Sequence, residues 1–330
     1  MKATQITLAS RPKGTPRAED FGRATVELPA PGAGELAVKV IYLSVDPYMR
    51  GRMNDAKSYV PPFVLGEAIN GGAVAEVLES RADGFSPGDL VVGTAKWADF
   101  DIVVARGVQK IEPSSISPSA YLGILGMPGL TAYVGLLDLA SPRRGETVFV
   151  SGAAGAVGST VGQIARIKGC KVIGSAGGPE KVQRLLELGF DGAVDYRSGN
   201  IVKLLGDAAP DGIDIYFDNV GGDHLVAALE ATRDHARLVL CGAISRYNDS
   251  APTPGPWNLF RVIQRRLTLR GFIVSDHGAR RPEFISDMTT WLREGEINYD
   301  ETIAEGLDAA PEAFLGLFSG ANLGKMVVRL

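Results

Sequence analysis

The sequence predicts an α/β protein in which a doubly wound parallel sheet is inserted into a second, β-rich domain. Three observations predict this fold: the length of 330 residues, short β-like runs in the first third, and alternating strand and helix patterns in the middle. A chain of this length is too long for one compact core and comfortable for two. We therefore expect a β-rich domain at 1–124, completed by 296–330, and a second domain at 125–295.

The composition is that of an ordinary globular protein, with 45% hydrophobic and 22% charged residues. The net charge is −4 and basic residues are interspersed with acidic ones, which disfavours nucleic acid as a partner. No apolar run approaches about 20 residues, and the N-terminus lacks the apolar region of a signal peptide. Cys170 and Cys241 are far apart, as expected in a reducing compartment. We expect a cytoplasmic protein that uses neither a membrane nor nucleic acid.

The β-rich domain is predicted from short runs separated by Pro and Gly, at 35–43, 72–78 and 90–94. At the other end of the chain, 324–330 alternates as a final strand that we expect to pair back with this domain. The residues between the last helical pattern and this strand are interpreted as a polar stretch.

The inserted domain is predicted from alternation, which is typical of βαβ units and a parallel sheet of about six strands. Strand patterns lie at 147–150, 171–175, 212–218, 237–241 and 268–274. Helical patterns lie at 157–167, 180–188, 225–232, 258–266 and 282–293.

A glycine-rich turn, from Ser151 to Gly158, joins the first of these strands to a helix. It matches the Gly-x-Gly-x-x-Gly pattern of dinucleotide-binding turns, with Ala153 in place of the first glycine. Gly155 would let the backbone approach a pyrophosphate, and Gly158 would let the helix pack closely on the strand. The helix N-terminus would face the negative charge. The alternative is a turn without a ligand, but the strand and helix on either side favour dinucleotide binding.

The end of the second strand lacks the Asp or Glu that usually binds the adenosine ribose of NAD. The sequence there is Ser175-Ala176-Gly177-Gly178, followed by Lys181. A missing carboxylate with a nearby cation favours the 2′-phosphate of NADP. The alternative is that Lys181 only decorates the first turn of a helix, where the helix dipole makes a cation slightly unfavourable.

No metal site is expected, because a catalytic zinc needs three or four suitable ligands. The three histidines, His224, His235 and His277, all lie in the second half, and no Cys-x-x-Cys pair occurs. Glu67 stands where zinc alcohol dehydrogenases carry histidine. A Gly-x-Ser-x-Gly nucleophile elbow before a helix is also absent.

Several motifs together carry a resemblance that covers nearly the whole chain. They are Ser44-Val45-Asp46-Pro47-Tyr48-Met49-Arg50, Gly126 to Tyr133, Ala153 to Gly158, Phe217 to Gly222, Cys241 to Asn248 and Asn322-Leu323-Gly324-Lys325. In these motifs the chain resembles the medium-chain dehydrogenase/reductase superfamily, in its zinc-independent group of leukotriene B4 12-hydroxydehydrogenases, prostaglandin reductases and NADPH-dependent 2-alkenal and curcumin reductases. The resemblance implies a Rossmann domain inserted into a GroES-like catalytic domain, and a homodimer whose sheets meet near 267–274.

The resemblance also implies which residues bind NADPH. Lys181 and Tyr196 match the positions that bind the 2′-phosphate. Asn219 would contact the nicotinamide half of the cofactor, and Asn322, near the end of the chain, would be a further cofactor contact. The full expected set is Gly155, Ala156, Val157, Gly158, Lys181, Tyr196, Asn219, Cys241, Gly242, Ala243, Ile244, Ser245, Tyr247, Phe272, Ile273, Val274 and Asn322. Tyr196 as a half-buried tyrosine, Asn219 as a turn residue and Cys241 as packing remain open alternatives.

The expected reaction is NADPH-dependent reduction of the double bond of an α,β-unsaturated ketone or aldehyde. Tyr247 is the first candidate for stabilising the enolate and Tyr48 the second, although Tyr48 could instead be a hinge residue. An apolar pocket between the domains is expected from Tyr48, Met127, Trp257 and Phe260. The alternatives are a quinone oxidoreductase of the same superfamily, alcohol oxidation in the reverse sense, and a cofactor-binding protein without turnover.

Overall fold

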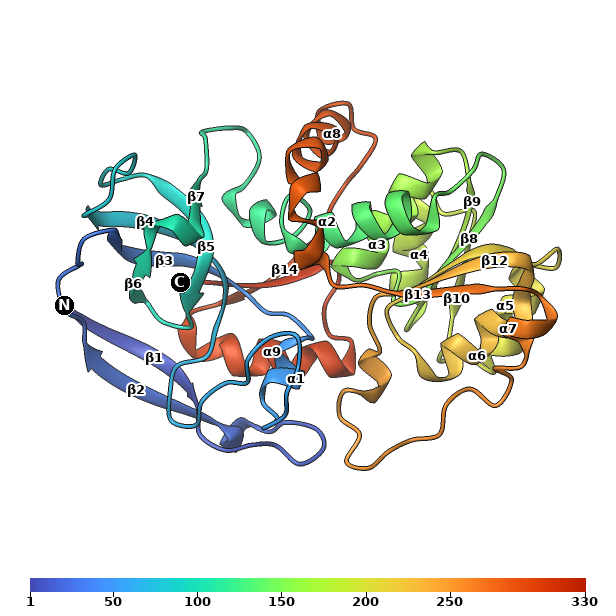
Figure 1. The fold of residues 1–330 in the computed structure, drawn as a ribbon, viewed down its shortest axis with the longest axis horizontal. Coiled ribbons are helices and arrows are strands. Elements are labelled where there is room, and N and C mark those ends of the chain that lie inside the picture. Colours follow the sequence, from blue (N-terminus) through green and yellow to red (C-terminus); the bar gives the residue numbers. More distant parts are fainter. The chain divides into compact units, whose positions relative to one another are not determined.

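The computed structural model describes all residues from 1 to 330, in two compact units. Unit 1 consists of Met1–Leu122 and Glu301–Leu330, and unit 2 of Gly123–Asp300. The predicted fold class, a parallel α/β sheet with a separate β-rich unit, is confirmed (Figure 1). No helix combines the length and the apolar character that crossing a bilayer requires.

Unit 2 is built on a six-stranded sheet in the order β10-β9-β8-β11-β12-β13, with all neighbours parallel. The strands are β8 (Thr147–Val150), β9 (Lys171–Ala176), β10 (Gly192–Asp195), β11 (Ile213–Asp218), β12 (Thr232–Leu240) and β13 (Thr268–Gly271). Every residue of β8 is buried, as expected of a central strand covered on both faces.

The helices of unit 2 are α2 (Met127–Val134), α3 (Ala156–Ile167), α4 (Pro179–Glu187), α5 (Ile201–Ala208), α6 (Gly222–Ala231), α7 (Arg261–Gln264) and α8 (Arg281–Arg293). Helices α3 to α7 each lie between two consecutive strands of this sheet, whereas α2 precedes β8 and α8 follows β13. A parallel sheet needs such crossovers, because consecutive parallel strands start at the same edge. All the carboxyl ends of the strands therefore lie at one edge, where the candidate site is found.

Three details of unit 2 differ from the sequence prediction. Strand β10 and helix α5 had no individual prediction, because four strand residues beside a short helix give too little periodicity. Helix α7 is shorter than the predicted 258–266, since the chain turns at Arg266, whose φ is 51°. Strand β13 ends at Gly271, opposite the last residue of β12, so 272–274 lie outside the sheet.

Unit 1 contains a β-sheet in the order β14-β15-β3-β4-β5-β7, with β6 paired to β3, and a separate hairpin β1-β2. The strands are β1 (Lys2–Leu8), β2 (Phe21–Glu27), β3 (Glu35–Ser44), β4 (Asn70–Ser80), β5 (Leu90–Lys96), β6 (Phe100–Val104), β7 (Val108–Lys110), β14 (Glu301–Glu305) and β15 (Lys325–Arg329). Strand β15 pairs antiparallel with β3, as expected for the final strand. The helices are α1 (Met49–Arg52) and α9 (Ala310–Ser319).

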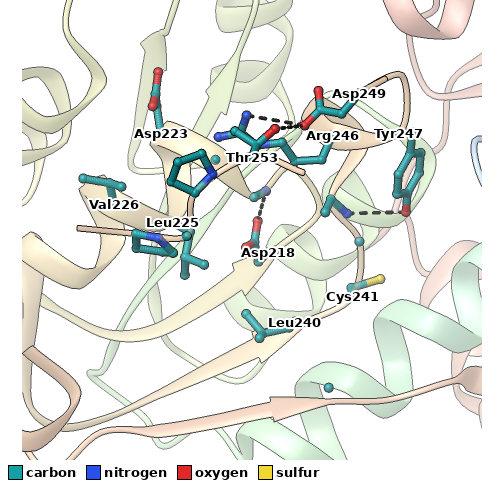
Figure 2. A pocket seen from close by; sticks show the side chains of 18 of the residues that line it. Asp218, Asp223, Leu225, Val226, Leu240, Cys241, Arg246, Tyr247, Asp249 and Thr253 are labelled. Atoms are coloured by element: carbon teal, nitrogen blue, oxygen red, sulfur yellow. Dashed lines mark hydrogen bonds and ion pairs between the residues drawn. The ribbon is translucent and has the colours of Figure 1, made fainter. Parts of the chain in front are cut away.

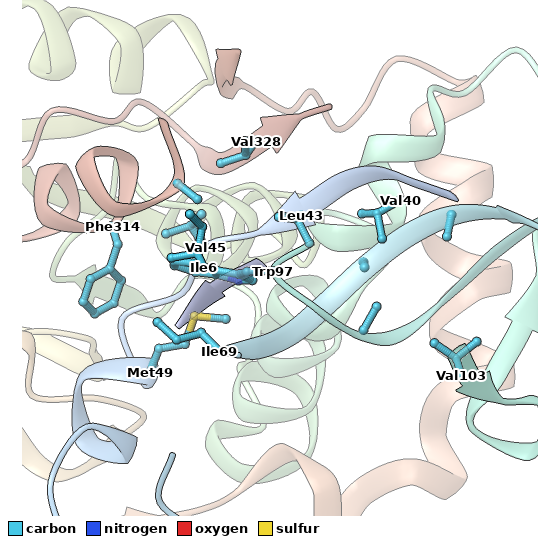
Figure 3. Packing of buried hydrophobic residues seen from close by; sticks show 14 of the residues in the cluster. Ile6, Val40, Leu43, Val45, Met49, Ile69, Trp97, Val103, Phe314 and Val328 are labelled. Atoms are coloured by element: carbon cyan, nitrogen blue, oxygen red, sulfur yellow. The ribbon is translucent and has the colours of Figure 1, made fainter. Parts of the chain in front are cut away.

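The interpretation of the region before the last strand as a polar stretch is wrong. It contains β14 and α9, and α9 buries Ala310, Ala313, Phe314 and Leu317. Their spacing of three and four residues is that of one apolar helix face, and this signal was available in the sequence. Phe314 joins the core of unit 1 in an edge contact with Trp97, at 6.4 Å between ring centroids (Figure 3).

Candidate active site

The glycine turn after β8 is shaped for a close backbone approach. Gly152 has a φ of 58°, in the left-handed region that favours glycine. A Cβ on Gly158 would lie 2.4 Å from the Gly152 carbonyl oxygen, so only glycine lets α3 pack on the turn. Helix α3 begins at Ala156 without a side-chain cap, so its first N–H groups remain available for an anion. The predicted residues Gly155, Ala156, Val157 and Gly158 thus lie together at this helix N-terminus.

Positive charge gathers at the ends of β9 and β10. Lys181 lies in the first turn of α4, and burial together with the charge of Arg197 lowers the pKa of its ammonium group. The Tyr196 hydroxyl lies 2.8 Å from where a Cβ on Gly177 would be, and so does the Arg197 Nε. Tyr196 and Arg197 therefore flank Gly177, and Lys181 is close enough to Arg197 for the two charges to interact, an arrangement that suits a phosphate group.

One carboxylate lies beside this group of cations, but backbone amides hold it. The Asp195 side chain accepts hydrogen bonds from the N–H groups of Gly178 and Arg197, both at 2.9 Å. It fixes the loop after β9 against the end of β10. Asp195 and Arg197 could not be identified from the sequence, because the pairing of β10 with β9 is what brings them to Gly178.

The loop after β11 that carries Asn219 is held by buried polar groups. The Asn219 backbone N–H donates to Ser151 Oγ at 3.0 Å, and its side-chain Nδ2 donates to the Ser151 carbonyl at 2.8 Å. Asp218 Oδ1 accepts from the Tyr216 hydroxyl at 2.6 Å and from the Gly221 N–H at 2.7 Å. Burial raises the pKa of Asp218. These supports fix the position of Asn219 at the carboxyl edge of the sheet, where open α/β folds bind ligands.

The segment from Cys241 to Tyr247 continues this edge. The N–H groups of Cys241 and Gly242 both donate to the Asp218 carbonyl, at 2.9 and 3.0 Å. The Tyr247 hydroxyl accepts from the Ala243 N–H at 3.4 Å, which places the phenol back over the start of its own segment. Burial and the charge of Asp218 raise the pKa of the Cys241 thiol to about 12, so it remains protonated.

A cavity of about 1070 Å³ opens beside this segment in unit 2 (Figure 2). Its wall includes Tyr247, Trp257 and Phe272. In Figure 2, Tyr247 and Cys241 lie at one end and Val226 at the other. The cavity is large enough for a drug-sized ligand or part of a dinucleotide.

The remaining predicted residues of unit 2 are placed as follows. Ile244 and Ser245 lie in the turn before Tyr247, and Ile273 lines the cavity next to Phe272, whereas Val274 does not. Of the three residues of unit 2 predicted for the substrate pocket, Trp257 lines this cavity and is 79% exposed, while Phe260 and Met127 do not line it.

Two predicted residues belong to unit 1. Tyr48 is half-buried directly before α1, and Asn322 lies just before β15, where its Nδ2 donates to the Gly324 carbonyl at 2.8 Å. Asp46, two residues before Tyr48, pairs with the buried Lys325 at 3.2 Å. This ion pair ties the segment of Tyr48 to the segment of Asn322.

The residues present fit NADP. The glycine turn would hold the pyrophosphate. A Cβ on Gly158 would fill the space in this turn, which glycine leaves open. Tyr196 and Arg197 beside Gly177, together with Lys181, would bind the 2′-phosphate. Sequence reasoning missed Ser151, Asp218 and Tyr216, which hold the turn and the Asn219 loop together.

Comparisons with known proteins find relatives that cover nearly the whole chain. Residues 4–111 match the family described as N-terminal domain of oxidoreductase, and 156–292 match the family described as zinc-binding dehydrogenase. The chain is 44% identical to the NADPH-dependent curcumin reductase of Escherichia coli, over 98% of this chain and 95% of the relative. It is also 44% identical to the NADP(+)-dependent 2-alkenal reductase of Nicotiana tabacum, over 98% of this chain and 96% of the relative. Among solved structures, CurA of Vibrio vulnificus in complex with NADPH has a TM-score of 0.94 and 43% identity, covering 99% of this chain and 98% of CurA.

Proposed function

The chain belongs to the NADP-dependent reductase group of the medium-chain dehydrogenase/reductase superfamily, and we propose that it uses NADPH to reduce the carbon–carbon double bond of α,β-unsaturated ketones and aldehydes. The observation that carries the cofactor assignment is the pair of features at the sheet edge. The glycine turn suits a pyrophosphate, and Tyr196 and Arg197 beside Gly177, with the charge of Lys181 near that of Arg197, suit a 2′-phosphate. The substrate class follows from the relatives, whose names describe curcumin and 2-alkenal reductases.

The chemistry that NADPH brings when bound is hydride donation, here to the β-carbon of the substrate. The chain's own residues must orient the reactants and stabilise the negative charge that develops on the carbonyl oxygen. Tyr247 is proposed to hold the donor network for this charge, because its hydroxyl already accepts a hydrogen bond from Ala243. Asn219 is proposed to contact the nicotinamide half, supported by the hydrogen bonds that fix its loop.

The reaction is proposed to need no metal ion, because tyrosine hydroxyls can stabilise the developing charge. The substrate is proposed to be an apolar molecule held against side chains such as Trp257, with few polar contacts. Broad specificity for hydrophobic enones is expected from such a surface.

The test is NADPH oxidation by the purified full chain with matched panels of enones, alkenals and 1,4-quinones, with NADH as the control cofactor. Turnover of 4-phenyl-3-buten-2-one and alkenals, retained in EDTA and weak with NADH, supports the proposal. Activity with quinones alone would assign the chain to quinone reduction instead. Tight NADPH binding without any turnover would assign it to a binding role.

We also propose a cytoplasmic homodimer. Strand β13 is the edge of the parallel sheet and mostly exposed, so its backbone can pair with a second copy. The two cysteines are both free, as in a reducing compartment. Sedimentation of the full chain tests the dimer.

A further inference from the structure

The cavity of unit 2 has an apolar wall whose charges are nearly all of one sign. Leu225, Val226 and Trp257 belong to its apolar part. The acidic residues of the wall are Asp218, Asp223, Asp249 and Asp276. Arg246 is the only basic residue among those that line the cavity. A ligand in the cavity is therefore surrounded by more negative than positive charge.

The one cation of the wall is already paired. Arg246 Nη1 lies 3.6 Å from Asp249 Oδ2, and the Thr253 hydroxyl donates a hydrogen bond to the same oxygen (Figure 2). Arg246 and Asp249 thus largely neutralise each other. The other aspartates of the wall form no ion pair, so their negative charges remain.

Asp218 carries its charge inside the protein, at 2% exposure. Burial raises the pKa of its carboxyl, but hydrogen bonds from the Tyr216 hydroxyl and the N–H groups of Val220 and Gly221 stabilise the ionised form. The charge acts on the neighbouring wall, because together with burial it raises the pKa of the Cys241 thiol to about 12. Solvent and salt screen a buried charge less than an exposed one, so Asp218 acts on a ligand at physiological salt.

Asp223 and Asp276 carry their charges where the cavity meets solvent. Asp223 lies in the first turn of α6, Asp276 lies in the turn after β13, and both are exposed. Solvent screens these charges, but apolar walls between charges of one sign concentrate their field in the cavity. An anion that enters therefore passes two carboxylates and meets a third, Asp218, inside.

The phosphates of NADPH are proposed to bind elsewhere in unit 2. The glycine turn from Ser151 to Gly158 does not line the cavity, and neither do Gly177, Lys181 and Arg197. The negative wall is therefore compatible with the proposed cofactor site. Its charge acts on the remaining ligand, which is the substrate.

We propose that this wall selects uncharged enones against enones that carry a free carboxylate, with Asp223 and Asp276 as the specificity-determining residues. This inference rests on the proposed function and narrows its substrate class. A carboxylate that enters the cavity loses water and gains no cationic partner, which costs binding free energy. A methyl ester of the same molecule has no charge and keeps its contacts with the apolar part of the wall, such as Trp257.

Matched substrates test the selection with the full chain. They are the para-carboxylic acid of 4-phenyl-3-buten-2-one and the methyl ester of that acid, each reduced with saturating NADPH at neutral pH. We expect kcat/KM for the ester to be about tenfold above that for the acid, the effect of two charges acting across an apolar cavity. Asp223→Asn and Asp276→Asn should each lower this ratio about twofold to threefold, and high salt should lower it as well.

The control variant is Asp207→Asn, which removes an exposed charge of the same unit outside the wall. It changes the net charge of the chain as the other two variants do, and it should leave the ratio unchanged. The acid and the ester differ in intrinsic reactivity, but this difference is the same for every variant. A change in the ratio between variants therefore reports the charge of the wall.

A second measurement does not depend on turnover. The saturated ketones formed from the two substrates are titrated into the full chain with bound NADP⁺. Quenching of Trp257 fluorescence reports binding, since this side chain is 79% exposed on the wall, and Trp257→Phe shows how much of the signal belongs to it. The ester should bind about tenfold more tightly than the acid, and Asp223→Asn and Asp276→Asn should each reduce the difference.

The outcomes separate this inference from the proposed function. Equal binding and equal kcat/KM of acid and ester in the wild type would overturn the selection and leave enone reduction intact. A preference for the ester that neither Asp223→Asn nor Asp276→Asn reduces would also overturn it, because these charges would not be its cause. A wild type that reduces no enone, but binds the saturated ester better than the acid in a way that both variants weaken, would overturn the proposed function and leave the selection by charge standing.

Discussion

The imidazole ring of His224 packs edge-on against the ring of Tyr196, with centroids 5.2 Å apart and planes at 76°. His224 lies in the first turn of α6 and is 6% exposed, and its Nε2 has no hydrogen-bond partner. Burial lowers the pKa of His224 to about 4, so the ring is neutral at physiological pH. His224, which the sequence indicates only as a possible metal ligand, thus supports the tyrosine proposed to bind the 2′-phosphate.

The first prediction concerns the pH dependence of stability. Below pH 6.5 the unfolded chain protonates His224, whereas the folded chain resists protonation until about pH 4. The contribution of His224 to the free energy of unfolding is therefore complete above pH 6.5. It falls as the pH drops from 6.5 towards 4, and about 2 kcal/mol of it is lost at pH 5. His224→Phe should remove this loss while keeping the ring contact. Urea unfolding at pH 7 and pH 5 measures it, with His277→Phe as the control. Equal losses in wild type and His224→Phe would show that His224 does not titrate this way.

The second prediction concerns cofactor choice. Lys181→Ala should raise the Kd for NADPH by about tenfold or more, because a charge-assisted hydrogen bond contributes about 1.5–3 kcal/mol. The Kd for NADH, which has no 2′-phosphate, should change little. Nicotinamide fluorescence titration measures both. Lys203→Ala, at an exposed lysine of the same unit, is the control. Equal losses for the two dinucleotides would reject the 2′-phosphate role.

The third prediction concerns the glycine turn. Gly158→Ala would push a methyl group to within 2.4 Å of the Gly152 carbonyl oxygen and should cost about 1–3 kcal/mol of stability. It should also weaken NADPH and NADH alike, since both carry a pyrophosphate. Gly206→Ala, in α5 with no atom within 4 Å of the new Cβ, should instead stabilise by about 0.5–1 kcal/mol. Urea unfolding and dinucleotide titration compare the two, and a harmless Gly158→Ala would contradict the close packing of α3.

The fourth prediction concerns Tyr247. Tyr247→Phe removes the hydroxyl that accepts from Ala243 and should lower kcat for an enone by about tenfold, the effect of losing one hydrogen bond. The Kd for NADPH should rise less. Steady-state kinetics and titration measure the two, with Tyr121→Phe in unit 1 as the control. Unchanged kinetics would remove Tyr247 from the mechanism.

The sequence by itself determined the fold class and the glycine turn. The apolar runs of β8 and β9 and the helical pattern of α3 are local signals, because side chains repeat with the period of the element that they form. Gly155 and Gly158 could be interpreted for a related reason, since close approach of the backbone restricts these positions to glycine. The missing carboxylate after β9, with Lys181 beyond it, predicted NADP from the residues alone.

The tertiary structure alone decided which polar groups support the site. Strand β11 pairs with β8, and this pairing brings Tyr216 and Asp218 to Ser151. Along the chain, Ser151 lies about 65 residues before them. His224 meets Tyr196, and Asp195 meets Gly178, through the order of strands and helices. Local periodicity is written in the sequence, whereas contacts between elements depend on how the sheet is assembled.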